Sequence, residues 1–559
     1  MFVRAKKSGK YEYLQVVHNE WIDGHVKQRV IATLGRVDVL QATGQIDGLI
    51  RSSARFAEHI SVLDAHRRGK TSPADRIRIG PPLVFERLWR ECGIKAIITG
   101  LLSDRKFEFD VERAVFLTVL HRLFDPGSDR AAEVWRHQYA IDGVKRLQLH
   151  HLYRAMAWLG LPLPAEEQAG ATPFAPRTTK DLIEERLFSR RRDLFSTLDV
   201  VFFDTTSIYF EGDGGESIGQ YGNSKDHRSD RKQMVVGVVL DGEGRPICCE
   251  LWPGNTADVT TLIPVVDRLR ERFRIGTISI VADRGMISKA TISELQKKER
   301  NIQFILGARL RRVKEIREGV LSRGGRYHEV FGRKRRTKDP APLKVKEVRV
   351  ADRRYIVCYN EDQARKDKAD RDAIVAALSD RLKQGDKSLV GNKGYRKFLK
   401  VRGEGHFDID EARVRAEARF DGKWVLQTDT DLDPAEVALK YKELWMVESL
   451  FRSMKSVLET RPIYHKCDET IRGHVFCSFL GLVVLKELLQ RMEERGWSVE
   501  WERLKRDLDG LEEFTVPNAG RTFVIRSRTE GDAGKAIQAA GVALGPVVRL
   551  CEEDSSEKG

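Results

Sequence analysis

Cysteine is scarce in this sequence, and it does not occur at the spacings that bind metals. The 559 residues include 7 cysteines, an odd number, and no two of them form a Cys-x-x-Cys pair. A disulfide framework is typical of short chains with an even number of cysteines, and a zinc knuckle needs cysteines at short, regular spacings. The composition therefore argues against both, and it predicts a protein that works in the reducing cytoplasm.

Long hydrophobic runs are also missing. The N-terminal stretch MFVRAKKSGKYEYLQVV has basic residues but no apolar core, so it does not resemble a secretory signal. The longest apolar stretch worth testing runs from Val475 to Leu485 and is ended by Lys486. A helix needs about 20 apolar residues to cross a bilayer, so we interpret this stretch as a buried helix and expect no membrane partner.

Charge, in contrast, is plentiful and unbalanced. The chain has 98 Lys+Arg against 83 Asp+Glu, a net charge of +15. Residues 309–345 alone hold 13 basic and 4 acidic residues, including the run Arg333–Arg336. Such a surplus indicates a polyanionic partner, with nucleic acid first, an anionic membrane surface second and an ordinary basic enzyme as the third possibility. We interpret the local surplus as an insertion that contacts phosphates, with a solvated loop as the alternative.

The hydrophobic pattern changes along the chain. YLQVVHNEW and VKQRVIATLG are β-rich runs separated by a turn that contains Asp23-Gly24, which predicts a hairpin. Apolar residues then recur at helical spacing from about 45 to 195. From residue 198 short β-branched runs alternate with helical patterns, which predicts an α/β fold with a buried sheet.

Two aspartates follow apolar runs of the kind found in central strands. Val200–Phe203 leads into Asp204, and Ile278–Ala282 leads into Asp283. A buried carboxylate must be solvated, paired or bound to a cation, and two neighbouring carboxylates repel unless a divalent cation lies between them. If the two strands are neighbours, these acids face each other where the strands are expected to end. The simpler alternative is that each aspartate begins a turn.

A third acid lies on a helix whose start is marked clearly. Asp433 can cap the helix, Pro434 suits its first turn and Glu436 completes a capping box, and the helix is expected to run to about Glu459. The residues that share one face of it are Tyr441, Trp445, Glu448, Arg452 and Lys455. This mixture is neither a core face nor a plain solvent face, although a surface helix with a Glu448–Arg452 pair remains the alternative. Three carboxylates can hold two Mg²⁺ ions for phosphoryl transfer.

These motifs resemble those of the DDE transposases of bacterial insertion sequences. The third-acid helix of one group carries a Tyr-(2)-Arg-(3)-Glu-(6)-Lys signature, which stands here as Tyr441, Leu444, Glu448 and Lys455. Leucine replaces the signature arginine, so a DNA contact at that position is not carried over. The sequences Asp204-Thr205-Thr206 and Ala282-Asp283-Arg284-Gly285 also look like the family's first and second acid motifs.

The resemblance implies an RNase H-like mixed sheet with flanking helices, interrupted by a β-rich insertion. The spacings agree, because Asp204 and Asp283 are 79 residues apart whereas Asp283 and Glu448 are 165 apart. The expected segments are a β-hairpin segment at 1–45, a mainly helical DNA-binding region at 46–195, the first part of the catalytic core at 198–309, a β-rich basic insertion at 310–432, the second part of the core with the third-acid helix at 433–495, and a C-terminal region with a tail at 496–559.

The resemblance further implies a DNA transposase that cleaves at element ends and joins the 3′-hydroxyl to target DNA. Asp204, Asp283 and Glu448 would be catalytic and would hold Mg²⁺, which Mn²⁺ can replace. The expected DNA contacts are Tyr441, Arg452, Lys455, Arg284, Lys225 and Arg228, with an ordinary basic turn as the alternative for the last two. The partners would be double-stranded DNA, as terminal inverted repeats and as target, and further copies of the chain in a homodimer or larger synaptic complex, in a nucleoid-associated, cytoplasmic setting.

Two other functions remain open on the same residues. A DNA nuclease or resolvase on this fold would cleave without joining, and a non-catalytic derivative would bind DNA only. A glycosidase with two carboxylates would explain the acids but not the basic insertion.

Overall fold

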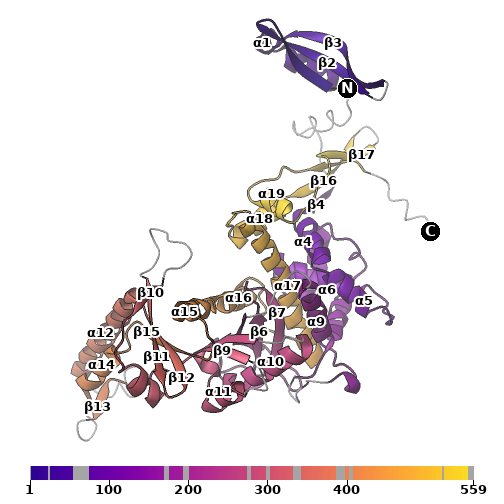
Figure 1. The fold of residues 1–559 in the computed structure, drawn as a ribbon. Coiled ribbons are helices and arrows are strands. Elements are labelled where there is room, and N and C mark those ends of the chain that lie inside the picture. The colour runs from indigo at the N-terminus through magenta and orange to yellow at the C-terminus, as the bar shows by residue number, and fades with distance from the viewer. Residues whose placement is uncertain are drawn as a thin grey trace.

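The fold is described from a computed structural model (Figure 1). The residues that it describes are 2–22, 25–54, 75–168, 171, 175–192, 200–273, 278–297, 302–330, 342–384, 397–401, 407–518 and 521–551. The run Arg333–Arg336, which we interpreted as a phosphate contact, lies outside the described residues.

A nine-stranded mixed sheet forms the centre of the molecule. Its order is β10-β11-β12-β15-β9-β8-β5-β6-β7. β5, β6 and β7 form an antiparallel meander, whereas β8 and β9 run parallel to β5. This arrangement confirms the predicted α/β class with an RNase H-like mixed sheet. The five strands of the core are β5 (Val200–Tyr209), β6 (Gln233–Leu240), β7 (Pro246–Pro253), β8 (Ile278–Ala282) and β9 (Ile302–Gly307).

The central strands are buried on both faces because side chains alternate along a strand. Phe203 of β5 packs into one hydrophobic cluster, together with apolar residues of α10 and α11. The neighbouring Phe202 packs into the other cluster, which includes apolar residues of α16 and α17. The helices that complete these clusters are α10 (Asp258–Phe273), α11 (Lys289–Leu295), α16 (Trp445–Ser456) and α17 (Asp468–Glu494).

Strand β5 is longer than expected. We predicted that it ends at Asp204, but it continues to Tyr209, because its second half still pairs with β6, up to Tyr209 opposite Gln233. Its parallel pairing with β8, however, stops at Phe203 opposite Ala282. Asp204 therefore lies within a strand, at the point where the neighbouring strand ends.

The strands of segment 310–432 extend the same sheet. β15 pairs antiparallel with β9, and β12, β11 and β10 follow outward. Figure 1 shows this part as one end of the molecule, with α12 and α14 beside the strands. Its elements are β10 (His328–Val330), β11 (Leu343–Val350), β12 (Arg353–Tyr359), α12 (Glu361–Gln384), β13 (Leu399–Val401), β14 (Phe407–Ile409), α14 (Glu411–Ala418) and β15 (Lys423–Thr428).

The expected third-acid helix is two helices rather than one. α15 (Pro434–Lys442) starts with the predicted capping box of Asp433 and Glu436. The helix breaks at Glu443 and Leu444, where backbone amides donate to carbonyls three residues back, for example Leu444 to Tyr441. Such tighter turns interrupt the regular α-helical pattern, so α16 begins afresh at Trp445.

Helices dominate between the N-terminal sheet and the core. α17 packs against α6 and α8 and buries the apolar stretch Val475–Leu485, as predicted. In the described parts of the chain, no helix is long and apolar enough to cross a membrane. The helices of this region are α4 (Gly80–Glu91), α5 (Ile94–Leu101), α6 (Val111–Phe124), α7 (Asp129–Trp135), α8 (Leu149–Leu159) and α9 (Thr179–Arg192).

Both ends of the chain contribute sheets. The predicted hairpin is confirmed as β2 and β3, and an additional strand β1 pairs with β2. Near the C-terminus a four-stranded sheet has the order β18-β17-β16-β4, so a strand from early in the chain pairs with late ones. The elements of these two regions are β1 (Phe2–Ser8), β2 (Tyr11–Ile22), β3 (His25–Arg36), α1 (Val37–Ala42), α2 (Gln45–Ala54), β4 (Asp75–Arg78), α18 (Trp501–Asp509), β16 (Glu512–Asn518), β17 (Arg521–Arg526), α19 (Ala533–Ala539) and β18 (Val548–Leu550).

A buried histidine makes the helical region sensitive to acid. Burial and the neighbouring Arg122 lower the pKa of His121 from 6.5 to about 4. As the pH falls, the unfolded chain binds a proton at this histidine near pH 6.5, whereas the folded protein does so only near pH 4. The free energy of unfolding therefore decreases between these two pH values, by on the order of 3 kcal/mol in total. We expect His121→Gln to flatten the pH dependence of urea unfolding, whereas the exposed His137→Gln should leave it unchanged. Equal slopes for wild type and His121→Gln would contradict this assignment.

Candidate active site

Two of the predicted acids lie side by side. Because β5 and β8 are parallel neighbours whose last paired residues are Phe203 and Ala282, Asp204 and Asp283 follow at the same level of the sheet. Asp204 is partly buried. Burial raises its pKa to about 6, the Lys225 ammonium opposes this rise, and the charges of Asp283 and Asp258 add to it. Closely spaced carboxylates therefore lie where β8 ends beside the middle of β5, as the sequence predicted.

Asp258 is a carboxylate of this site that sequence reasoning missed. It is the first residue of α10, and its Oδ1 accepts a hydrogen bond of 2.8 Å from Thr205 Oγ1. A Cβ atom on Gly285 would lie 3.7 Å from Asp258 Oδ2 and 4.0 Å from Asp283 Oδ2, so the two carboxylates border the same space. The signal available in the sequence is weak, because an aspartate at a helix start is ordinary capping chemistry.

Lys225 points into this site. Its Nζ donates to the Thr205 backbone oxygen at 2.6 Å and to Thr205 Oγ1 at 2.9 Å, and it lies 3.2 Å from Asp258 Oδ2. These contacts make its ammonium a counter-charge for the acids. The DNA contact that the sequence predicts for this lysine stays a prediction.

The next residue ties the same loop to α16. Asp226 accepts a hydrogen bond of 2.9 Å from Lys455 Nζ and lies 3.3 Å from Arg461 Nη1. The side chains of Asp226 and Lys455 are both largely buried. Lys455 of the predicted signature therefore pairs with a buried carboxylate, and it positions the loop that carries Lys225.

Tyr441 reaches the second acid from α15. Its hydroxyl donates to Asp283 Oδ1 at 3.1 Å. Burial, reinforced by the Asp283 charge, raises the pKa of Tyr441 far above its usual range, so the phenol keeps its proton and remains a donor. Gly307 at the end of β9 makes room for the ring, because a Cβ atom there would lie 2.2 Å from the Tyr441 hydroxyl.

Glu448 lies between Tyr441 and Lys455 in the sequence but takes no part in their hydrogen bonds. It lies seven residues after Tyr441 and seven before Lys455, on an exposed part of α16. Among the described residues its carboxylate has no hydrogen bond and no ion pair, and the alternative pair with Arg452 is not formed. The structure thus brings together Asp204 and Asp283, and it leaves Glu448 facing solvent on the adjoining helix.

The remaining predicted DNA contacts differ in their surroundings. Arg284 and Arg452 are exposed, Arg284 directly after Asp283 and Arg452 one turn beyond Glu448. Arg228 instead pairs with Asp230 at 2.9 Å and lies over the Tyr209 ring.

Comparison with known families decides what kind of protein carries this site. The profile described as a transposase DDE domain matches residues 196–483, just over half of the chain and the segment that holds all three acids. The chain belongs to the transposase DDE domain family. Residues 2–65 of this transposase also match the profile described as the N-terminal domain of IS1634 family transposases.

Solved structures similar to this transposase are also transposases, at low identity. A piggyBac transposase synaptic complex with hairpin DNA has 11% sequence identity and a TM-score of 0.38, with 77% of this chain and 79% of that chain covered. A Mos1 mariner paired end complex with Mn has 13% identity and a TM-score of 0.14, covering 36% and 62%. No curated protein matches the chain.

A second group of possible metal ligands lies elsewhere in the transposase. Within the described residues, one set of three such side chains has ligand atoms close enough to share an ion, namely Asp129, His465 and His474. The Arg122 guanidinium lies 2.8 Å from His474 Nδ1, however, and burial and this arginine lower the pKa of His474 well below its usual range. A buried cation at the ligand atom opposes a metal ion, so we interpret this group as a polar contact in which His465 lies between Asp129 of α7 and His474 of α17.

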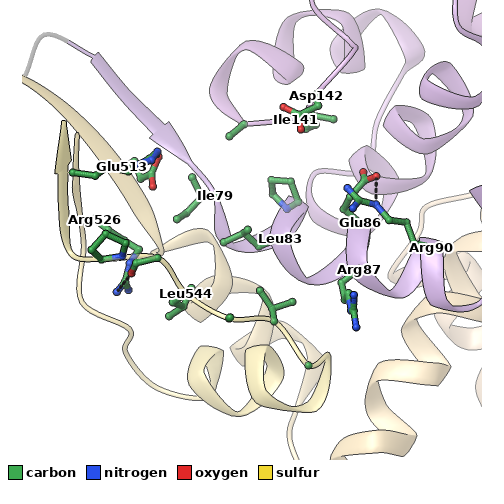
Figure 2. A pocket seen from close by; sticks show the side chains of 18 residues that line it. Ile79, Leu83, Glu86, Arg87, Arg90, Ile141, Asp142, Glu513, Arg526 and Leu544 are labelled. Atoms are coloured by element: carbon green, nitrogen blue, oxygen red, sulfur yellow. Dashed lines mark hydrogen bonds and ion pairs between the residues drawn. The ribbon is translucent and has the colours of Figure 1, made fainter. Parts of the chain in front are cut away.

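A separate cavity of about 650 Å³ lies between α4 and the C-terminal sheet (Figure 2). Its arginines are already engaged, for example Arg90 with Glu86 at 3.2 Å and Arg549 with Glu513 at 2.6 Å. The elements that form it contribute none of the acids described above, so we assign it no catalytic role.

Replacing Tyr441 by phenylalanine should slow the reaction of this transposase without unfolding it. The change removes only the hydroxyl that donates to Asp283. A hydrogen bond to a charged group contributes about 1.5–3 kcal/mol, so we expect DNA cleavage to slow by roughly 10- to 100-fold. The exposed Tyr464→Phe is the matched control. Unchanged cleavage by Tyr441→Phe in a gel assay would show that the hydroxyl does not position Asp283.

Proposed function

We propose that this transposase cleaves DNA at the ends of a mobile element and joins the freed 3′-hydroxyl to target DNA. Asp204, Asp283 and Glu448 would be the catalytic acids and the ligands of divalent cations, with Mg²⁺ as the working ion. The observation that carries the proposal is the placement of Asp204 and Asp283 at the same level of adjacent parallel strands.

The residues present suit such an ion. Carboxylate oxygens are the hard donors that Mg²⁺ prefers, and Asp204 and Asp283 offer them at one sheet edge. Burial raises the pKa of Asp204 and the charge of Asp283 adds to the rise, so a bound divalent cation would stabilise the charged form of this carboxylate. When bound, divalent cations supply activation of a water or 3′-hydroxyl and stabilise the leaving oxygen in an in-line displacement.

The chain's own residues hold this site in shape. Tyr441 fixes the orientation of the Asp283 carboxylate through its hydroxyl. Asp258 and Lys225 both bind the Thr205 hydroxyl, and Lys225 also binds the Thr205 backbone oxygen, so together they fix the backbone directly after Asp204. Both act by positioning, and neither is needed to touch the reacting phosphate.

Completion of the site requires Glu448 to approach the two aspartates. Its exposed position on α16, next to the break at Glu443 and Leu444, leaves its carboxylate available to do so. Arg284, directly after Asp283, and Arg452, one turn beyond Glu448, are exposed and would contact DNA phosphates. DNA binding would thus bring substrate and third acid to the same place.

The wider assembly follows from the reaction. Joining two element ends to one target requires both ends to be held together, which a homodimer or larger synaptic complex would do. The N-terminal residues 1–195 are the part we propose for recognition of terminal inverted repeats.

Strand joining tests this function against its nearest alternative. Purified protein is incubated with Mg²⁺, precut element ends and a plasmid target. A transposase yields ends covalently joined to the plasmid, whereas a nuclease or resolvase on the same fold cleaves DNA but yields no joined product. A non-catalytic derivative would bind the ends and give neither.

A further inference from the structure

A groove in segment 310–432 has the chemistry of an anion site. It has a volume of about 1000 Å³ and lies among β10, β11, β12, α12 and the turn before β15. Two tyrosines line it, Tyr327 and Tyr359, with ring centres 6.0 Å apart. Five basic and three acidic side chains complete the charged part of its lining.

Each acid of the groove lies within ion-pair distance of a cation other than Lys346 and Lys423, although two of the acids share one lysine. Glu361 pairs with Lys344, which also lies 3.9 Å from Glu329. Asp421 pairs with Arg371 of α12. These carboxylates therefore do not balance the remaining lysines.

The ammonium of Lys346 is buried in the wall of the groove without an acidic partner. It is only 8% exposed, and its Nζ donates to the Arg323 backbone oxygen at 2.7 Å and lies 5.2 Å from the centre of the Tyr327 ring. In the described part of the chain no carboxylate forms an ion pair with it. Burial, and the charge of Lys423, lower the pKa of Lys346.

Lys423 adds a second uncompensated charge on the same wall. Its Nζ donates to the Arg419 backbone oxygen at 3.0 Å, and none of the described carboxylates pairs with it either. Burying a cation without a counter-charge is costly, and two such cations close together increase the cost. An anion bound between the two lysines would supply the missing counter-charge and would reduce the repulsion between them.

We propose that this groove binds the phosphodiester backbone of a DNA strand, with Lys346 and Lys423 contacting phosphate and the faces of Tyr327 and Tyr359 available to the adjoining sugar or base. The exposed Lys368 on α12 would extend the contact along the strand. The proposal rests on the proposed function, since it assumes that the protein acts on DNA.

The salt dependence of DNA binding tests this site. Each lysine that contacts a phosphate contributes about one unit to the slope of log K against log[salt]. For Lys346→Met/Lys423→Met, fluorescence anisotropy with a random duplex should therefore show a slope smaller by about two and a clearly weaker affinity. The control Lys366→Met/Lys383→Met removes the same charge from the exposed surface of α12 and should change the slope less.

The outcomes separate this proposal from the function on which it rests. Should the double variant fail to fold, as judged by circular dichroism, Lys423→Met alone is expected to reduce the slope by about one. A slope equal to that of wild type, or equal losses in the control, would overturn the groove while leaving cleavage and joining untouched. A wild-type protein that neither binds nor cleaves DNA would overturn the proposed function itself.

Discussion

Asp204→Asn is expected to abolish DNA strand cleavage while leaving DNA binding nearly intact. The substitution preserves the shape of the side chain but removes the charge that we propose holds a divalent cation beside Asp283. Metal-assisted stabilisation of the transition state contributes several kcal/mol, and a loss of about 4 kcal/mol corresponds to roughly a thousandfold in rate. The measurement is single-turnover cleavage of an element end in Mg²⁺, together with anisotropy of the same DNA.

A matched variant separates the proposed ligand from the residues that position it. Asp258→Asn removes the charge of another carboxylate of this site, which holds Thr205 and Lys225. We expect it to slow cleavage far less than Asp204→Asn. Retained cleavage by pure Asp204→Asn, or equal losses in both variants, would argue against the assignment of Asp204 as a metal ligand.

Arg272→Met is expected to destabilise the protein by about 3–5 kcal/mol. The Arg272 side chain is only 2% exposed, and it joins α10 to α9 and β7. Its guanidinium contacts four carboxylates, at Asp181, Glu184, Glu185 and Glu250, at distances from 2.6 to 3.0 Å. Removing it leaves buried acids without their main partner, although Lys180 and Arg268 remain nearby.

Urea unfolding monitored by circular dichroism measures this loss. Arg270→Met lies two residues away on the same helix and has no ion pair among the described residues, so it should cost about 1 kcal/mol or less. Adding Glu184→Gln to Arg272→Met should recover part of the stability, because it removes one of the uncompensated charges. Equal effects of Arg272→Met and Arg270→Met would show that the network does not join these elements.

The core of the fold could be predicted from the sequence because its signals are local. Val200–Phe203 and Ile278–Ala282 are continuous apolar runs, and such runs predict central strands without knowledge of their partners. The start of α15 was equally readable from Asp433, Pro434 and Glu436.

The errors arose where pairing with distant residues decides the structure. β5 passes Asp204 because β6 continues to pair with it, and the sequence of β5 alone does not show this. The break between α15 and α16 follows Tyr441, whose hydroxyl is bound by the distant Asp283, and the helical pattern of the segment does not show this contact. The C-terminal sheet could not be predicted because β16 pairs with β4, which is far away in the chain. The ion pair of Arg76 and Glu512 joins these two strands.

The candidate site divides in the same way. Asp204 and Asp283 were predictable because each follows a recognisable apolar run. Asp258 and the inward direction of Lys225 were not, because they depend on how α10 and the loop after β5 fold against Thr205. Glu448 was predicted from its spacing to Tyr441 and Lys455, and we propose that its approach to the other acids accompanies DNA binding.

Strand joining by a Glu448 variant tests the central claim most directly. Glu448→Gln and Glu443→Gln each remove one carboxylate charge from neighbouring turns of the third-acid segment. With precut element ends, a plasmid target and Mg²⁺, we predict that Glu443→Gln joins DNA at close to the wild-type rate. Glu448→Gln is predicted to yield no joined product while still binding the ends. Joining by Glu448→Gln at the wild-type rate, with or without a loss in Glu443→Gln, would contradict the three-acid site.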